Sequence, residues 1–209
     1  MDEKWLGARH ASPLAMKLQH SMSWGKQSKY NPQKHNRQSN RLRGYDYTQS
    51  GAYFVTMVTY QRACLFGEIV EGEMRLNELG QIADDCWRAI PDHFDRVELG
   101  AYVVMPNHVH GIILINETNA DVGATHESPQ PDPPQRPRGP IPGSLGAIIG
   151  SYKSAVSRRI GQEYDIAGIW QRNYHDRIIR NRRELDAIWR YIEANPANWD
   201  ADNENPRPR

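Results

Sequence analysis

The segment at residues 97–115 constrains the fold most, because it holds two apolar runs joined by a very short connection. Both runs, 97–105 and 109–115, are rich in β-branched and aliphatic residues, which predicts two strands. Pro106 and Asn107 stand between them and are typical of a tight turn. So short a connection joins only antiparallel strands, because a parallel pair needs a crossover of about a dozen residues or more.

Further apolar patterns extend this pair into an α+β domain. More strands are predicted at residues 53–60 and 169–179, with a small hairpin at 68–76. Apolar residues at helical spacing predict helices at residues 79–90, 145–156 and 185–192. Asn181 is the expected N-cap of the last helix, and Glu184 follows it in capping-box position. This order predicts a sandwich in which helices pack on a mainly antiparallel sheet.

The chain has 209 residues, of which 38% are apolar and 24% charged, with a mean hydropathy of −0.78. This composition fits one ordinary domain with polar segments outside its core. Residues 1–43 hold nine lysines and arginines and little apolar periodicity, so we expect a basic, mostly disordered arm. Residues 117–142 hold seven prolines, which predict an exposed loop. The expected domain spans residues 44–200, and residues 201–209 form a polar tail.

Several function classes find no support in the sequence. No apolar run reaches the length of a membrane helix, and the polar beginning of the chain does not fit a secretory signal. Cys64 and Cys86 stand far apart, which excludes a disulfide framework and a cysteine zinc site. Neither a phosphate-binding glycine loop nor a nucleophile elbow occurs. We expect a cytoplasmic protein that does not bind membranes.

His108 and His110 stand two residues apart at the start of a predicted strand. Side chains alternate along a strand, so both imidazoles lie on the same face and can form a bidentate platform for a metal ion. The same spacing also fits two polar residues on a solvent-facing strand edge. A zinc site would need a third ligand, and the neighbouring sequence shows none.

Tyr191 and Asn195 stand four residues apart on the last predicted helix and therefore share a face. They flank its apolar stripe, at the edge of the core. Pro196 disfavours helical geometry for the residue before it, so we expect Asn195 at the helix end with its amide able to turn toward a metal. The alternative is a boundary aromatic residue followed by a helix C-cap.

Basic and aromatic residues alternate in the second half of the chain. Neutralisation of phosphates combined with stacking on aromatic rings is how proteins bind single strands. Arginines at helix ends are also ordinary solvated residues, so this pattern alone does not distinguish a DNA-binding surface from a solvated one. The candidate DNA-binding residues are Lys153, Arg158, Arg159, Arg172, Tyr174, Arg177 and Arg180.

Four segments together resemble one known family. Residues 105–111, Met-Pro-Asn-His-Val-His-Gly, resemble the HUH motif, in which a hydrophobic residue separates two histidines. Residues 53–56 and 65–67 resemble the opening strand and turn of that family. Residues 168–179 and 191–196 resemble its C-terminal signature. In this order, the motifs resemble those of the single-tyrosine HUH transposases, and most of all the REP-associated tyrosine transposase branch.

The resemblance covers about residues 45–200 and implies a ferredoxin-like α+β fold. It implies metal-dependent cleavage and rejoining of single-stranded DNA hairpins by a monomer or a homodimer, without ATP. His108 and His110 match the catalytic metal-binding pair, and Tyr191 matches the nucleophile that forms a 5′-phosphotyrosine. Asn195 matches the position of a third, amide ligand, where some relatives have the longer Gln. The implied cofactor is Mg²⁺ or Mn²⁺.

Two other functions stay open at the level of the sequence. A relative that has lost turnover would bind DNA hairpins without cleaving them. A metal hydrolase of another kind would use His108 and His110 to activate water, and Tyr191 would then be dispensable.

Overall fold

The computed structural model describes residues 45–117 and 140–206. The predicted basic arm and most of the predicted proline-rich loop lie outside the described residues. The elements in chain order are β1 (Gly51–Val58), η1 (Tyr60–Arg62), β2 (Gly67–Val70), β3 (Glu73–Leu76), α2 (Glu78–Arg88), α3 (Ile90–His93), β4 (Val97–Val104), β5 (His108–Ile115), α4 (Leu145–Tyr164), β6 (His175–Ile179), α5 (Arg182–Ala194) and η2 (Pro196–Ala201).

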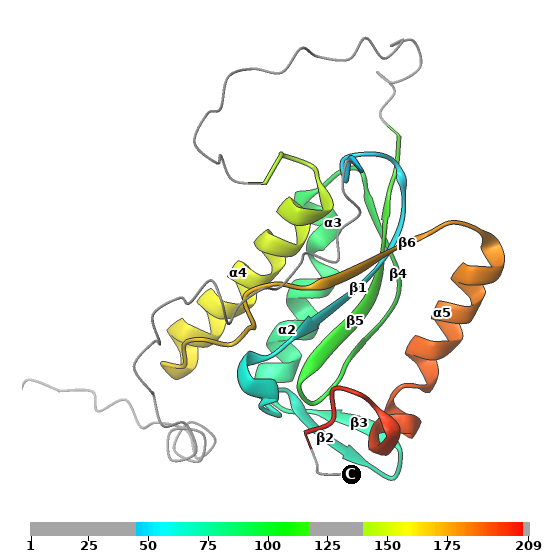
Figure 1. Ribbon diagram of the computed structural model, residues 1–209. Coiled ribbons are helices and arrows are strands. Elements are labelled where there is room, and N and C mark those ends of the chain that lie inside the picture. Colours follow the sequence, from blue (N-terminus) through cyan, green and yellow to red (C-terminus); the bar gives the residue numbers. More distant parts are fainter. Residues whose placement is uncertain (1–44, 118–139, 207–209) are drawn as a thin grey trace, which may run out of the picture.

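Four strands form one sheet in the order β4-β5-β1-β6, and each neighbouring pair is antiparallel. The helices α2 and α4 cover one face of this sheet, and α5 covers the other (Figure 1). The hairpin of β2 and β3 stands apart as a second, two-stranded sheet. The predicted α+β class, with helices packed on a mainly antiparallel sheet, is confirmed, and the strand order is that of a ferredoxin-like sandwich.

Alternation along β1 separates the two faces of the sheet. Tyr53, Val55 and Met57 are fully buried in the core shared with α2 and α4. Phe54 packs toward α5 on the opposite face, and Thr56 of the same face lies opposite a β5 histidine. The α5 face is therefore the one on which apolar packing gives way to polar side chains.

Side-chain caps fix where the three long helices begin. Asn77, Ser144 and Asn181 each accept a hydrogen bond from a backbone N–H in the first turn of the following helix. The Glu184 carboxylate reaches the backbone N–H of Arg180 rather than that of the N-cap residue. The last helix therefore starts at the predicted cap, but without the reciprocal bond of a capping box.

The strand predicted at residues 169–179 is shorter in the structure. Only His175–Ile179 pairs with β1, and Trp170 makes one isolated bridge to Thr59. The Lys153 ammonium group donates hydrogen bonds to the backbone carbonyls of residues 171 and 173. These carbonyls are bound by a side chain instead of a neighbouring strand, so the segment stays irregular.

Gly111 directly follows His110 on β5, and its lack of a side chain makes room for the Trp87 ring of α2. A methyl group at this position would overlap that ring. We expect Gly111→Ala to lower the free energy of unfolding by about 1–3 kcal/mol, measured by urea denaturation. Gly150→Ala on α4 is the control, because nothing lies within 4 Å of the added carbon. A helix-interior alanine there should leave stability unchanged or raise it; equal losses in both variants would contradict the packing explanation.

Candidate active site

The two histidines of β5 lie on the sheet face covered by α5. His108 and His110 are 0% and 4% exposed, and their ring centroids are 4.4 Å apart. Such burial does not fit two polar residues on a solvent-facing strand edge. Two adjacent imidazoles removed from water need partners for their ring nitrogens, and these partners define the site.

Asn107 fixes the orientation and the tautomer of His108. Its Nδ2 donates to the backbone carbonyls of Arg62 and Glu204, at 3.0 and 2.7 Å. The Oδ1 atom is therefore the acceptor for His108 Nδ1 at 2.9 Å, which places the imidazole hydrogen on Nδ1. The Nε2 lone pair of His108 is buried and has no hydrogen-bond partner among the described residues. In proteins, histidines that ligate metal ions are commonly oriented in this way by a second residue.

His110 is held between two hydroxyl groups. Thr56 Oγ1 lies 2.8 Å from Nδ1, because Thr56 and His110 are directly opposite in the pairing of β1 with β5. The Tyr191 hydroxyl of α5 lies 3.2 Å from Nε2. The second histidine thus connects the sheet to the helix that carries the tyrosine.

The end of α5 and the turn after it supply oxygen and amide groups. Asn195 is the C-cap residue of α5 and is 2% exposed. Its Nδ2 donates to Asp202 Oδ2 at 3.1 Å, and its buried Oδ1 has no partner among the described residues. Ligand atoms of His108, His110 and Asp202 lie within 4.8 Å of one another. These three residues form a group that could hold a metal ion.

The sequence reasoning missed Asp202, which lies in the segment predicted as a polar tail. Trp199 anchors this segment: it is buried, and its ring centroid lies 6.0 Å from that of His108. Glu204 closes the same segment onto the domain through an ion pair with Arg62 at 3.0 Å. A single tryptophan in an otherwise polar stretch was the available signal that the stretch packs against the domain.

The donor set fits a divalent cation. Two buried atoms with lone pairs, His108 Nε2 and Asn195 Oδ1, have no hydrogen-bond partner in the described part of the chain. Unsatisfied buried polar atoms are rare and costly, and a bound ion would satisfy both. The Asp202 carboxylate adds a negative charge beside neutral nitrogen ligands. Imidazole together with carboxylate and amide oxygen is a mixed set that suits ions such as Mn²⁺.

Burial keeps both histidines of the site neutral. It lowers the pKa of His108 to about 4, against the opposing influence of the Asp202 carboxylate and of Asn195. Burial, with the neighbouring His108, also holds the pKa of His110 well below its usual value. Both imidazoles are therefore neutral at pH 7, and a neutral imidazole is the form that ligates metal.

Tyr191 lies where the buried site meets solvent. Its side chain is 47% exposed, while its ring contacts those of His110 and Phe54, with centroids 5.3 and 6.1 Å away. Burial and the Asp202 carboxylate raise its pKa, although Asn195 acts in the opposite direction. The residue is a neutral phenol at pH 7, and a nearby cation would favour its ionised form.

Comparison with known proteins assigns the chain to a family by sequence and to a fold by structure. No model of a known protein family matches the chain. An uncharacterized protein of Haemophilus influenzae is 37% identical over 175 residues, which cover 84% of this chain and 96% of that protein. The chain belongs to the family of this Haemophilus influenzae protein.

A solved structure of another protein shares the fold of the present chain. It is that of a REP-associated tyrosine transposase bound to a REP hairpin, with a TM-score of 0.51 and 19% identity. The similarity covers 77% of this chain and 74% of the other. At this identity the similarity shows the shared α+β fold alone.

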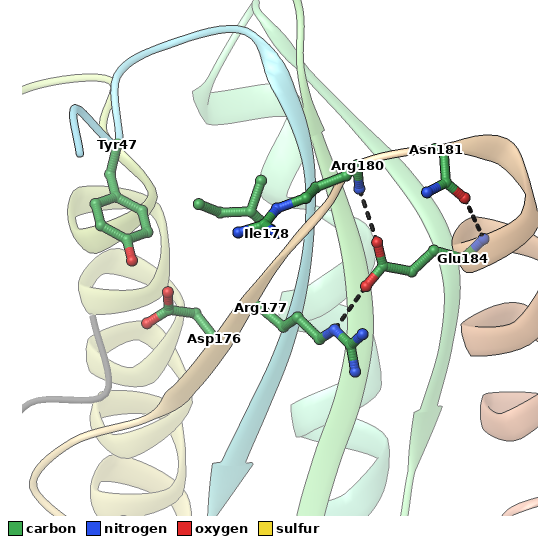
Figure 2. A pocket seen from close by; sticks show the side chains of 7 residues that line it. All are labelled: Tyr47, Asp176, Arg177, Ile178, Arg180, Asn181 and Glu184. Atoms are coloured by element: carbon green, nitrogen blue, oxygen red, sulfur yellow. Dashed lines mark hydrogen bonds and ion pairs between the residues drawn. The ribbon is translucent and has the colours of Figure 1, made fainter. Parts of the chain in front are cut away.

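In the present structure, the candidate DNA-binding residues do not form one surface. Arg177 of β6 and Arg180 after it line a cavity where α5 begins (Figure 2). Lys153, Arg158 and Arg159 lie on α4, which covers the opposite sheet face from Tyr191. Arg172 is exposed and Tyr174 is partly buried in the segment that precedes β6.

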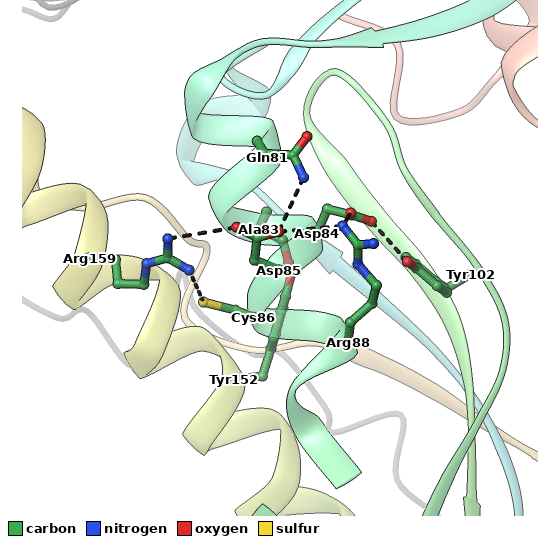
Figure 3. A network of polar contacts seen from close by, with 9 residues as sticks. All are labelled: Gln81, Ala83, Asp84, Asp85, Cys86, Arg88, Tyr102, Tyr152 and Arg159. Carbon is green, nitrogen blue, oxygen red and sulfur yellow. Dashed lines mark hydrogen bonds and ion pairs between the residues drawn. The ribbon is translucent and has the colours of Figure 1, made fainter. Parts of the chain in front are cut away.

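Arg159 belongs to a polar network between helices. It lies 3.7 Å from Asp85 of α2, and its Nη1 is 3.9 Å from Cys86 Sγ (Figure 3). Glu163 of the same helix lies 3.7 Å from Arg159. In the same network, the Tyr152 hydroxyl of α4 donates to the Ala83 carbonyl of α2 at 3.2 Å. These contacts hold α4 against α2, which is a structural role.

No helix in the described part of the chain is long and apolar enough to cross a membrane.

Metal binding should raise the melting temperature. With Mn²⁺ at about 100 times its Kd, we expect about 2.7 kcal/mol of stabilisation, or about 5–10 °C in Tm by differential scanning fluorimetry. His108→Gln should abolish the shift, because it removes the imidazole nitrogen. Asp202→Asn should reduce the shift, because it keeps an oxygen but removes the negative charge. The exposed His93 offers a matched control, His93→Gln. If Mn²⁺ raised the Tm of the wild type and of the three variants equally, the ion would bind elsewhere.

The metal-free protein should lose stability as the pH falls from about 6.5 to about 4. In this window the unfolded chain binds a proton at residue 108, whereas the buried His108 stays neutral until about pH 4. The depressed pKa accounts for up to about 3 kcal/mol. Urea midpoints measured against pH in the presence of a chelator should show a shallower slope for His108→Gln than for wild type. His93→Gln should keep the wild-type slope, and an unchanged slope in His108→Gln would contradict the assignment.

Proposed function

We propose that this protein is a metal-dependent transesterase that cleaves and rejoins single-stranded DNA at hairpin-forming repeats. It acts as a single-tyrosine HUH transposase of the REP-associated branch, with Tyr191 as nucleophile and His108 and His110 as metal ligands. The observation that carries the proposal is the position of the Tyr191 hydroxyl, 3.2 Å from His110 Nε2 at the edge of the His–His–Asp group.

The residues of the site fit the steps of this reaction. The oxygen of Tyr191 attacks the phosphorus, a Tyr–O–P bond forms, and the P–O3′ bond breaks with its electron pair on the 3′ oxygen. The phenol proton leaves to solvent and the 3′ oxygen takes up a proton, so the products are a 5′-phosphotyrosine and a 3′-OH. Attack by another 3′-OH reverses the step and rejoins the strand without ATP. The half-exposed position of Tyr191 lets a polynucleotide reach its oxygen.

A divalent ion would be held by His108, His110 and Asp202, with Asn195 as a further ligand through Oδ1. When bound, Mg²⁺ or Mn²⁺ polarises the phosphate and offsets the negative charge of the attacking oxygen. Asn107 and Thr56 keep the two imidazoles in place throughout. The raised pKa of Tyr191 makes this charge compensation necessary, because the phenolate is scarce without it.

Hairpin DNA as the substrate is supported by the motif resemblance and by the shared fold. The solved structure with this fold is a transposase bound to a REP hairpin. Hairpin recognition is carried to this chain as part of the proposal. The separation of basic residues onto two sheet faces supports a DNA path along the α5 side, near Arg177 and Arg180.

The decisive experiment detects a covalent protein–DNA adduct on a denaturing gel. Labelled single-stranded hairpin DNA incubated with protein and Mn²⁺ or Mg²⁺ should give an SDS-resistant adduct, which a chelator prevents. Tyr191→Phe should abolish the adduct, because it removes the attacking oxygen. Tyr60→Phe changes another exposed tyrosine and should leave the adduct intact.

Two results would replace the proposed mechanism. Cleavage that survives Tyr191→Phe without an adduct would indicate hydrolysis by metal-bound water. Tight hairpin binding with no cleavage under either ion would indicate a hairpin-binding protein without turnover.

A further inference from the structure

A cavity of about 420 Å³ opens along the outer edge of β6, where α5 begins. In the described part of the sheet, β6 is the terminal strand and pairs with β1. Tyr47 and Asp176 line one side of the cavity, Arg177 and Glu184 line the other, and Arg180 lies between them (Figure 2). The volume falls within the range of small-ligand sites.

The lining suits a nucleobase better than a bare phosphate. Two arginines and two carboxylates balance in charge, so the cavity offers no net attraction to an anion. Guanidinium groups donate to the ring nitrogens and carbonyl oxygens of bases, and carboxylates accept from their amino groups. Tyr47 is partly buried and adds an aromatic ring to the wall, a surface on which bases stack.

Arg177 is held in position by the start of α5. Its Nε forms an ion pair with Glu184 Oε1 at 2.6 Å, and Glu184 Oε2 accepts a hydrogen bond from the backbone N–H of Arg180 at 3.0 Å. The Arg177 side chain is 67% exposed, and its two Nη groups make no hydrogen bond within the described ranges. A guanidinium fixed through Nε, with its outer nitrogens open, is preorganised for a ligand.

The cavity lies at a defined distance from the proposed nucleophile. Arg177 pairs in register with Phe54, whose ring contacts Tyr191. Glu184 and Tyr191 are seven residues apart on α5, hence on the same helix face and about 10.5 Å apart along the axis. This length equals about three nucleotides at the 3.4 Å rise of a stacked strand.

We propose that this cavity binds one unstacked base of the single-stranded flank, about three nucleotides from the phosphate that Tyr191 attacks. The inference rests on the proposed function and adds to it a contact that sets the position of cleavage. Arg177 and Arg180 bind the base edge, and Tyr47 stacks on its face.

The test measures binding alone, in full-length Tyr191→Phe protein with a chelator, so that no cleavage occurs. The probe is a fluorescent DNA hairpin with an unpaired flank of about eight nucleotides, within the site sizes of single-strand grooves. An abasic site is moved through the flank one position at a time, and Kd is measured by anisotropy. We expect one position at which the missing base weakens binding about tenfold.

In the Tyr191→Phe background, Arg177→Gln or Arg180→Gln should remove the position-specific loss of affinity, because the contact with the base is already absent in these variants. The exposed Arg183 does not line the cavity, so Arg183→Gln is a control with the same change in charge. It should keep the loss at the same position. The cavity assignment alone would be overturned if binding stayed tight with the abasic site at every position. It would also be overturned if the position-specific loss of affinity persisted in both cavity variants. Failure to bind any hairpin would overturn the proposed function as well.

Discussion

The antiparallel pairing of β1 with β5 is the interaction on which the rest of the site depends. Its register sets Thr56 opposite His110 and directs both histidines to the α5 face. Gly111, the residue after His110, faces the other way and makes room for the Trp87 ring. A shift of the register by one residue would turn every one of these side chains to the opposite face. Burial of the apolar side chains on one face of the sheet therefore also fixes which polar side chains lie on the α5 face.

The site is assembled from segments that are far apart in the chain. β5 gives the imidazoles, α5 gives Tyr191 and Asn195, and the turn after η2 gives Asp202. Burial favours the neutral form of each of these groups: it lowers the pKa of both imidazoles and raises the pKa of the phenol. A cation held by these residues would compensate for both effects, because it would bind the imidazole lone pairs and lower the cost of a negative oxygen nearby.

Much of the fold was predictable because its signals are local. Alternation and helical spacing located the strands and helices, and Asn181 was recognisable as a cap. The strand at 169–179 was predicted too long, because composition does not reveal that Lys153 binds two of its carbonyls. Asp202 was missed for a similar reason, since only packing of Trp199 brings that segment to His108. The basic residues were grouped together, although the sheet separates those on α4 from Arg177 and Arg180.

The sequence by itself determined the α+β order, the spacing of the two histidines and the shared helix face of Tyr191 and Asn195, because each follows from the period of one element. The tertiary structure decided that the histidines are buried, that Asn107 sets the tautomer of His108, and that Asp202 joins them. These facts depend on contacts between residues up to about a hundred positions apart, and no local period encodes such contacts.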